Sequence, residues 1–463
     1  MMVQQMMRRR SLVWVGLYSI LFSGVAMAQL NGAHTPPVIP ACDANHPGQS
    51  PFPCGAIIIN TEPGSAAVDV AALLSAVGAD RHHVFPSVNA AAGRIPNVSV
   101  LADLLRLPGI EVIPDRPVRT LAKPGSKGKP GSGTDGGGQL VPAGVSRIGA
   151  GPGALVVSGN GVGVAIVDTG LDFAHTDMAV ASTCYDAFGG NCQDLNGHGT
   201  HVGGIVAALN NDVDVVGVAA AATLYGVRVL DANGSGNDST IMAGLQWVVN
   251  NAASLVVPIQ IVNMSLGRPG SLGDNPALHS LVQTLGAMGI SVVVAAGNDA
   301  TKEVSNMVPA VYPEVMAVAS TSANNGSNKC RGYAGFIATD TASYFTTDGS
   351  AVMISAPGER QENISRGCSV SSQGILSLKL GGGTTRASGT SMAAPHVAGV
   401  VALMLEQGGS GLSGQYLVDY IRNTLRSTAM GIGIAPLNSP TGDYSFDGVR
   451  EGVVSACAAV GAC

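Results

Sequence analysis

Residues 163–167 read GVAIV, five residues without a polar side chain. A strand with one face in water alternates apolar and polar residues, so this run predicts a strand that is buried on both faces. Three further short, mostly apolar runs lie at residues 223–229, 259–264 and 291–296. Helical spacing of apolar residues occurs at residues 241–250 and 278–288. This alternation predicts an α/β domain with a parallel sheet covered by helices on both faces.

The first of these strands leads directly into Asp168, Thr169 and Gly170. Sites built on parallel sheets lie at the carboxyl ends of the strands, so Asp168 is well placed for a functional role. Taken alone, an aspartate that caps a loop explains the same pattern equally well.

A second segment, residues 196–204, reads NGHGTHVGG. The glycines on both sides of His198 allow the backbone to approach a ligand closely. The residues that follow can form a helix, which would place His198 at its start as a candidate base. We interpret His201 as a structural histidine. A metal site at this pair is disfavoured, because the sequence HGTH lacks the i, i+4 spacing and the glutamate of the zinc motif.

Two further segments supply a nucleophile and a hydrogen-bond donor. Residues 388–399 read SGTSMAAPHVAG. Gly389 allows a sharp turn, and Ser391 then lies at a helix N-terminus, where positive partial charge favours a developing oxyanion. His396 points away from Ser391 along that helix, and we interpret it as structural. Asn298 ends the sequence AAGN and carries an amide suited to an oxyanion hole, although alone it is typical of a turn.

These segments, in this order, resemble the motifs of the subtilase family of serine proteases. The aspartate motif matches residues 167–170, the histidine motif residues 198–202 and the serine motif residues 389–396. The resemblance extends from about Gln139 to at least Glu406. Three motifs in the family's order, together with the asparagine motif, make the match highly specific. It implies a three-layer αβα subtilisin-like domain with a mostly parallel sheet.

The resemblance also implies a reaction, which is hydrolysis of peptide bonds through an acyl-enzyme on Ser391. His198 would take the proton of the Ser391 hydroxyl as a general base. Asp168 would fix the tautomer of the imidazole and stabilise the imidazolium. Asn298 and the backbone N–H of Ser391 would bind the oxyanion of the tetrahedral intermediate.

Two further segments resemble the family's substrate groove. The edge strand that pairs with an extended substrate corresponds to Gly234, Ser235 and Gly236. The wall of the P1 pocket corresponds to Ser265, Leu266 and Gly267. The sparse charge of this pocket suggests a broad, apolar P1 preference, and Asp299 would lie near its rim, where it could admit basic P1 residues. The expected partners are protein or peptide substrates.

The resemblance implies a structural Ca²⁺ site as well, because residues 209–218 (LNNDVDVVGV) resemble the family's calcium loop. The family's ligands correspond to Gln139, Asp177, Leu209, Asn211, Val213 and Val215. Three of them would bind through backbone carbonyls, and mixed oxygen donors of this number suit Ca²⁺. An Asx-rich surface turn without a metal is the alternative.

The chain before Gln139 divides into three parts. Residues 121–138 (LAKPGSKGKPGSGTDGGG) predict a flexible linker. Residues 55–120 predict the order β-α-β-(β)-α-β of a small α+β, ferredoxin-like unit, with Ser65 as the helix N-cap and a weak strand near residues 90–96. This unit resembles the family's inhibitor-like prodomain. The expected domains are a signal peptide (1–28), a prodomain (29–120), the linker (121–138) and a catalytic domain (139–463), with processing near Gly138 and Gln139.

The N-terminus and the cysteines predict export. Arg8, Arg9 and Arg10 precede an apolar segment that ends at Ala26-Met27-Ala28, a signal-peptidase pattern. A membrane anchor is the alternative, but the apolar segment is short. We expect a secreted protein, extracellular or periplasmic, without a stable membrane anchor. The eight cysteines allow 105 pairings, and their closeness in sequence suggests 42–54, 184–192, 330–368 and 457–463.

Composition excludes several classes of protein. Charged residues make up 12% and hydrophobic residues 46%, which excludes wholesale disorder. A net charge of −6 argues against a nucleic-acid partner. The glycines of residues 159–163 precede their strand, whereas the dinucleotide fingerprint follows one. The hypothesis is therefore a secreted serine endopeptidase, monomeric and made as a self-processing zymogen inhibited by its own prodomain. The alternative is a catalytically inactive homologue that acts as a binding module.

Overall fold

A computed structural model describes residues 56–61, 69–95, 97–121, 138–408, 411–442, 444 and 447–463. All of these residues belong to one compact unit, residues 41–463. The predicted signal peptide, Cys42, Cys54, Ser65 and most of the predicted linker lie outside the described residues.

A seven-stranded sheet forms the centre of the large part, in the order β16-β14-β12-β10-β6-β8-β7. Every adjacent pair in it is parallel. Its strands are β6 (Gly163–Asp168), β7 (Tyr185–Asp186), β8 (Thr223–Arg228), β10 (Ile259–Met264), β12 (Ser291–Ala295), β14 (Met316–Ser322) and β16 (Val352–Glu359). The four strands predicted from sequence are β6, β8, β10 and β12, so the predicted parallel sheet is confirmed.

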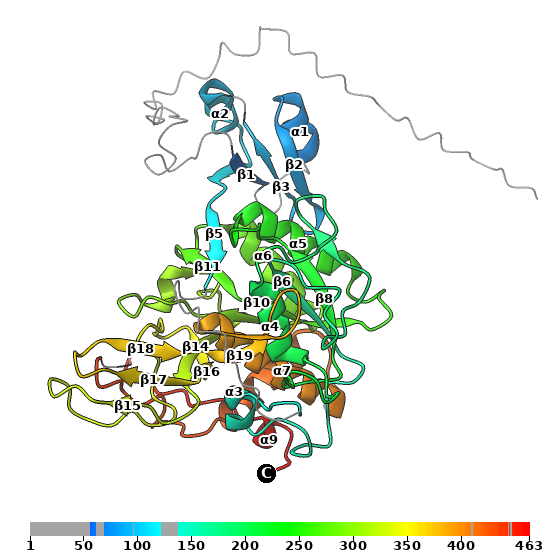
Figure 1. Ribbon diagram of the computed structural model, residues 1–463. Coiled ribbons are helices and arrows are strands. Elements are labelled where there is room, and N and C mark those ends of the chain that lie inside the picture. The colour runs from blue at the N-terminus through cyan, green and yellow to red at the C-terminus, as the bar shows by residue number, and fades with distance from the viewer. Residues whose placement is uncertain are drawn as a thin grey trace, which may run out of the picture. The chain divides into compact units, whose positions relative to one another are not determined.

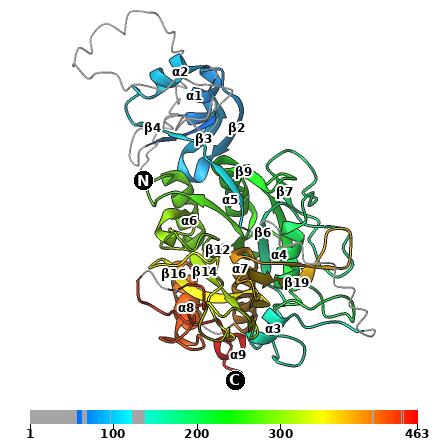
Figure 2. The ribbon, with the colours of Figure 1, turned by 60° about the vertical axis from the view of Figure 1, so that its left-hand side comes forward.

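Helices cover both faces of this sheet. The helices are α3 (Ala143–Arg147), α4 (His198–Ala207), α5 (Asp238–Asn251), α6 (Pro276–Ala287), α7 (Thr390–Gln407), α8 (Gly414–Ser427) and α9 (Ala456–Ala459). Figures 1 and 2 show α4 beside α7, and α5 beside α6. Val164 and Ile166 of β6 pack in the cluster that includes α4 and α7. Ala165 and Val167 pack in the cluster that includes α5 and α6, which confirms the three-layer αβα arrangement.

The N-terminal unit, residues 56–121, contains a four-stranded sheet in the order β2-β3-β1-β4. All its neighbouring pairs are antiparallel, as in a ferredoxin-like fold. Its elements are β1 (Ala56–Thr61), α1 (Val70–Ala76), β2 (Asp80–Phe85), a 3-10 turn (Pro86–Val88), β3 (Ala90–Arg94), α2 (Val98–Leu104), β4 (Ile110–Pro114) and β5 (Pro117–Thr120).

Two local predictions for this unit differ from the structure. Asp69, not Ser65, is the N-cap of α1, because its side chain accepts a hydrogen bond from the backbone N–H of Ala72 at 2.9 Å. The weak strand near residues 90–96 is the complete strand β3. Its small, buried alanines have low β propensity, but they pair with β1 on one side and β2 on the other.

The remaining strands form three small sheets. Strand β5 lies between β9 (Ser235–Asn237) and β11 (Leu266–Pro269), and β13 (Met307–Val308) pairs with β11. The other two sheets consist of β15 (Ser327–Asn328), β17 (Gln361–Ile364) and β18 (Val370–Gln373), and of β19 (Ile375–Leu378) and β20 (Thr384–Ala387). A second 3-10 turn spans Val304–Asn306.

Three disulfides connect the described cysteines: Cys184–Cys192, Cys330–Cys368 and Cys457–Cys463. They confirm three of the four predicted pairings, and the fourth lies outside the described residues. Over the described part of the chain, a search for helices with the length and apolarity to cross a membrane finds none.

Two side chains of the N-terminal unit form hydrogen bonds with helix α5. The buried Asp115 carboxylate accepts hydrogen bonds from the backbone N–H of Ser239 at 2.9 Å and from its hydroxyl at 2.6 Å. Ser87 donates its hydroxyl to Gln246 Oε1 at 2.6 Å. Asp115 therefore caps the N-terminus of α5, where the helix dipole favours a negative charge. Burial nevertheless raises the pKa of Asp115 from 3.8 to about 6.

This pKa predicts a pH-dependent free energy of unfolding. Because the pKa of Asp115 is higher in the folded protein than in the unfolded chain, protonated Asp115 stabilises the fold. This contribution to the free energy of unfolding is complete below pH 4 and is lost as the pH rises through about 6. From pH 4 to pH 8, we expect Asp115 to lower the free energy of unfolding by up to about 3 kcal/mol. Chemical unfolding of the Ser391→Ala chain at both pH values, with and without Asp115→Asn, measures this term. The matched control is Asp69→Asn at the exposed α1 cap, and equal pH dependence with and without Asp115→Asn would contradict the prediction.

Candidate active site

Asp168 and His198 are adjacent, although 30 residues separate them in sequence. Asp168 is the last residue of β6 and His198 is the first residue of α4. The His198 Nδ1 atom lies 2.8 and 2.9 Å from the two carboxylate oxygens of Asp168. Both side chains are buried, so the carboxylate fixes the orientation of the ring. The other ring nitrogen, Nε2, is also buried and has no hydrogen-bond partner among the described residues.

Ser391 and Asn298 form the second half of the site. Ser391 lies in the first turn of α7, which follows Gly389 with its φ of 147°. Asn298 follows β12, and its Oδ1 accepts hydrogen bonds from the backbone N–H of Thr390 at 2.9 Å and from the Thr390 hydroxyl at 3.1 Å. These bonds turn the amide nitrogen of Asn298 outward as a donor. The Ser391 hydroxyl donates to the carbonyl of Ser265 at 3.0 Å rather than to His198.

Strand β5 occupies the groove between the two predicted substrate-binding segments. It pairs antiparallel with β9 on one side and with β11 on the other, and β11 lies directly beside it in Figure 1. The backbone N–H of Thr120 donates to Gly234 O at 3.0 Å, and that of Leu121 donates to Ser265 O at 3.2 Å. The amide of Asn298 donates to the carbonyl oxygen of Leu121. Residues 117–121 thus lie where an extended peptide would lie, with the Leu121 carbonyl at Asn298.

The structure thus brings Asp168 to His198 and Asn298 to the start of α7, and α4 packs against α7. The comparisons with known proteins concern the chain as a whole. The family description "Subtilase family" matches residues 159–450. The chain belongs to the subtilase family. Family membership makes the protein a subtilisin-like serine endopeptidase.

Two relatives and one solved structure illustrate the similarity. Over 298 residues, the subtilase is 37% identical to M-protease of Shouchella clausii and 36% identical to subtilisin Savinase of Lederbergia lenta. Each match covers 64% of this chain. The matches cover 66% of the length of M-protease and 93% of the length of Savinase. Fervidolysin of Fervidobacterium pennivorans matches with a TM-score of 0.64 and 24% identity, over 88% of this chain and 61% of that one. The fervidolysin match supports the fold alone.

The sequence analysis missed Asp194, which connects the two halves of the Asp168–His198 pair. One of its buried carboxylate oxygens accepts a hydrogen bond from the Thr169 hydroxyl at 2.9 Å, beside Asp168. The backbone N–H groups of Asn196, Gly197 and Thr200, together with the Thr200 hydroxyl, also donate to this carboxylate. Asp194 thereby fixes the start of α4. An acidic residue just before a predicted helix start is the signal that could have identified it.

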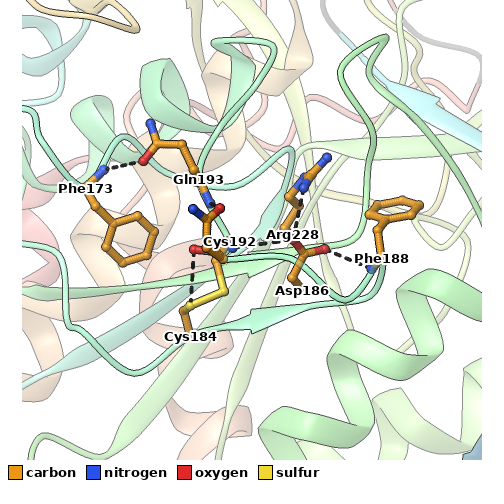
Figure 3. The surroundings of a disulfide bond; sticks show 8 residues. Phe173, Cys184, Asp186, Phe188, Cys192, Gln193 and Arg228 are labelled. Carbon is orange, nitrogen blue, oxygen red and sulfur yellow. Dashed lines mark hydrogen bonds and ion pairs between the residues drawn. A yellow bond between two sulfur atoms is a disulfide. The ribbon is translucent and has the colours of Figure 1, made fainter.

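The Cys184–Cys192 disulfide holds the loop that leads into Asp194 (Figure 3). Within this loop, Asp186 pairs with Arg228 at 2.9 Å and accepts the backbone N–H of Phe188 at 2.8 Å. At the end of the loop, the carbonyl of Cys192 accepts the backbone N–H of Leu171 at 3.3 Å. This contact and the disulfide fix the approach to Asp194 from two sides.

The histidines interpreted as structural are buried away from any solvent-exposed surface. His201 Nε2 lies 3.2 Å from the carbonyl of Ile375, and burial lowers the pKa of His201 to about 3. His396 Nδ1 lies 2.8 Å from the carbonyl of Met392, and burial lowers the pKa of His396 to about 4. Both rings are therefore neutral at pH 7. Asp299 accepts hydrogen bonds from the backbone N–H and the hydroxyl of Thr301, so its carboxylate stabilises a local turn.

The six residues matched to the calcium loop also lie together. The Gln139 amide nitrogen donates to the carbonyls of Leu209, Val213 and Val215, and lies 3.4 Å from Asn211 Oδ1. Asp177 accepts the backbone N–H of Val215 through Oδ2, whereas its buried Oδ1 has no hydrogen-bond partner among the described residues. Among those residues, no group of three or more His, Cys, Asp or Glu could hold a metal, so any site here depends on carbonyl and amide oxygens.

We predict that Asp194→Ala lowers the free energy of unfolding by about 3 kcal/mol or more, because it leaves buried donors without their charged acceptor. Asp194→Asn should cost less, because the amide oxygen still accepts at one position. The matched control is Asp231→Ala, since Asp231 caps a partly exposed turn through Asn233 and Ser235. Chemical unfolding in a Ser391→Ala background measures the three effects. Equal losses for Asp194→Ala and Asp231→Ala would show that Asp194 has no special role.

Proposed function

We propose that the protein is a secreted serine endopeptidase made as a self-processing precursor, with residues 56–121 as its inhibitor-like prodomain. The observation that carries this proposal is the position of the Leu121 carbonyl. It accepts a hydrogen bond from Asn298, and the Leu121 N–H donates to the same Ser265 carbonyl that accepts the Ser391 hydroxyl. A peptide held there as a strand is presented as a substrate is presented.

In the proposed reaction, the Ser391 hydroxyl first rotates from the carbonyl of Ser265 towards Nε2 of His198. That nitrogen takes the proton while the oxygen attacks the carbonyl carbon of the substrate. Asp168 stabilises the imidazolium, and the Asn298 amide and Ser391 N–H hold the oxyanion. The imidazolium then protonates the leaving amine, and water releases the acyl group from Ser391.

The groove supports recognition of an extended peptide through its backbone. Gly234 and Ser235 on one side and Ser265 and Gly267 on the other bind the chain of β5 by main-chain hydrogen bonds. Such bonds are independent of side chains, so many sequences can bind. We propose broad specificity with an apolar P1 residue, because Leu121 lies in that position against Gly267.

We propose that the Gln139 cluster holds a structural Ca²⁺ ion. Four acceptor oxygens converge on the Gln139 amide nitrogen, which lies where the ion would bind, and the unpartnered oxygen of Asp177 is buried. With the Gln139 amide turned over, its oxygen would face the ion instead. This donor set fits a hard cation such as Ca²⁺. The ligands would be the oxygens of Leu209, Val213 and Val215, with the side chains of Gln139, Asp177 and Asn211. The bound ion would tie the start of the catalytic domain to this loop.

A catalytically inactive binding module remains the competing function. It would keep the groove and the bound strand but would not cleave it. A fluorophosphonate that labels wild-type protein but not Ser391→Ala distinguishes the two functions, because only an activated serine hydroxyl reacts.

We predict that Ser391→Ala stays a single precursor chain, whereas wild-type protein separates the N-terminal unit from the catalytic domain. The substitution removes one hydroxyl, and the loss of a triad nucleophile leaves little catalysis. His198→Ala should behave in the same way, and Asn298→Ala should slow processing by ~10²–10³. Gel electrophoresis during refolding measures these rates. Maturation of purified Ser391→Ala at the wild-type rate would refute the assignment of Ser391.

For the calcium site, we predict that a chelator lowers the melting temperature by several degrees. A ligand at ~100 times its Kd stabilises the native state by about 2.7 kcal/mol. Calorimetry of metal-free Ser391→Ala protein, with and without added Ca²⁺, measures the shift without autolysis. Mg²⁺ is the control ion, and Asp177→Asn should reduce the effect of Ca²⁺. Equal melting temperatures with and without Ca²⁺ would exclude the site.

A further inference from the structure

We infer that the first self-cleavage breaks the Leu121–Ala122 peptide bond, not a bond near Gly138 and Gln139. This inference rests on the proposed function and specifies its first substrate. The mature enzyme would then begin at Ala122 and keep residues 122–138 as a 17-residue N-terminal extension.

The backbone of Leu121 is held at the catalytic centre from both ends. Its N–H donates to the carbonyl of Ser265 at 3.2 Å, and its own carbonyl accepts the Asn298 amide. The Ser391 hydroxyl donates to the same Ser265 carbonyl at 3.0 Å. A shared acceptor places the nucleophilic oxygen next to Leu121. The polarised carbonyl is therefore that of Leu121, and the bond that follows this carbonyl is the one exposed to attack.

The pairing of β5 fixes this register. Pro117, Val118 and Arg119 pair in order with Asn237, Gly236 and Ser235. On the other side, Arg119 and Thr120 pair with Gly267 and Leu266. A shift by one residue would exchange the faces of every side chain in the strand. Val118, which is buried in the core cluster of α5 and α6, would then be moved out of it.

The Leu121 side chain fits the space above Gly267. A Cβ atom added to Gly267 would lie 3.1 Å from Leu121 Cδ1, so Gly267 provides the room that the leucine uses. Leu121 also packs against both large core clusters of the molecule. An apolar side chain of this size is therefore favoured at the position before the cleaved bond, and a charged one would lose its hydration there.

The Gly138–Gln139 peptide bond, the other candidate for cleavage, lies next to residues that bind a different loop, residues 213–216. The backbone N–H of Leu140 donates to the carbonyl of Asp214 at 3.0 Å, and the Leu140 carbonyl accepts the N–H of Val216 at 3.1 Å. The Gln139 amide is bound to the same loop. Bringing the Gly138–Gln139 bond to Ser391 would require breaking all of these contacts and removing β5 from the groove.

The cleavage itself follows the proposed mechanism. Ser391 Oγ attacks the Leu121 carbonyl carbon, and its proton moves to His198 Nε2. The C–N bond to Ala122 breaks, and that nitrogen receives the proton from His198. Water then attacks the Leu121 ester, so that the products are a Leu121 carboxylate, a free Ala122 amine and a regenerated hydroxyl.

The experiment refolds the full wild-type chain at several concentrations in Ca²⁺ buffer and quenches it with acid at early times. N-terminal sequencing and intact mass identify the first new ends. We expect Ala122 as the first new N-terminus, formed at a rate that is independent of concentration. A first new N-terminus at any other residue, Gln139 included, overturns the inference.

Matched variants separate the position of the cut from effects on folding. Leu121→Asp should slow the cut by at least ~100-fold, because a carboxylate enters an apolar pocket. Leu107→Asp, at an exposed leucine of the same unit, should leave the rate unchanged. Gly267→Ala should slow the wild-type cut, because its Cβ would lie 3.1 Å from Leu121 Cδ1. Equal rates for Leu121→Asp and Leu107→Asp would contradict the role of Leu121.

Hydrolysis of an added peptide substrate distinguishes failure of this inference from failure of the proposed function. Wild-type protein that hydrolyses the peptide but is not cut after Leu121 overturns the inference alone. Wild-type protein that neither hydrolyses the peptide nor cuts itself overturns both.

Discussion

Burial on both faces is the constraint that organises this molecule. The interior of β6 is apolar because α4 and α7 cover one face and α5 and α6 cover the other. The polar groups of the candidate site therefore gather where the strands end, and all strands of a parallel sheet end on the same side. Asp168 ends β6, Asn298 follows β12, and Ser265 follows β10. The proposed catalytic centre is the place where these ends meet the first turns of α4 and α7.

The same constraint explains what could be predicted from the sequence. Two-sided burial leaves continuous apolar runs, and these identified β6, β8, β10 and β12 with errors of at most one residue at their ends. Gly197, next to His198, and Gly389, two residues before Ser391, marked the sharp turns into α4 and α7, which are positions with few alternatives in backbone geometry. The positions of His198 and Ser391 could therefore be predicted from the sequence, because the glycine turns before them constrain the backbone.

The occupant of the groove could not be predicted in this way. Residues 117–121 read PVRTL, which has no clear strand pattern, and both partners of β5 lie far along the chain. Leu121 was assigned to the linker because glycine, proline and serine dominate the residues after it. Asp115 and Asp194 were missed for a related reason. Each acts by accepting hydrogen bonds from helix N-termini, and single acidic residues before helices are common on protein surfaces.

The width of the groove depends on a buried ion pair. Arg268 lies in β11, on one side of β5, and Asp238 begins α5 directly after β9, on the other side. The guanidinium donates to both carboxylate oxygens of Asp238 at 2.8 and 2.6 Å, and both side chains are buried. A bidentate pair of this kind allows little change in separation. Because neighbouring strands lie about 4.8 Å apart, edges held at a fixed distance admit one strand between them and no more. Asp115 of the N-terminal unit caps this same helix through Ser239. The Asp115–Ser239 contact and the Arg268–Asp238 ion pair therefore meet at the first turn of α5.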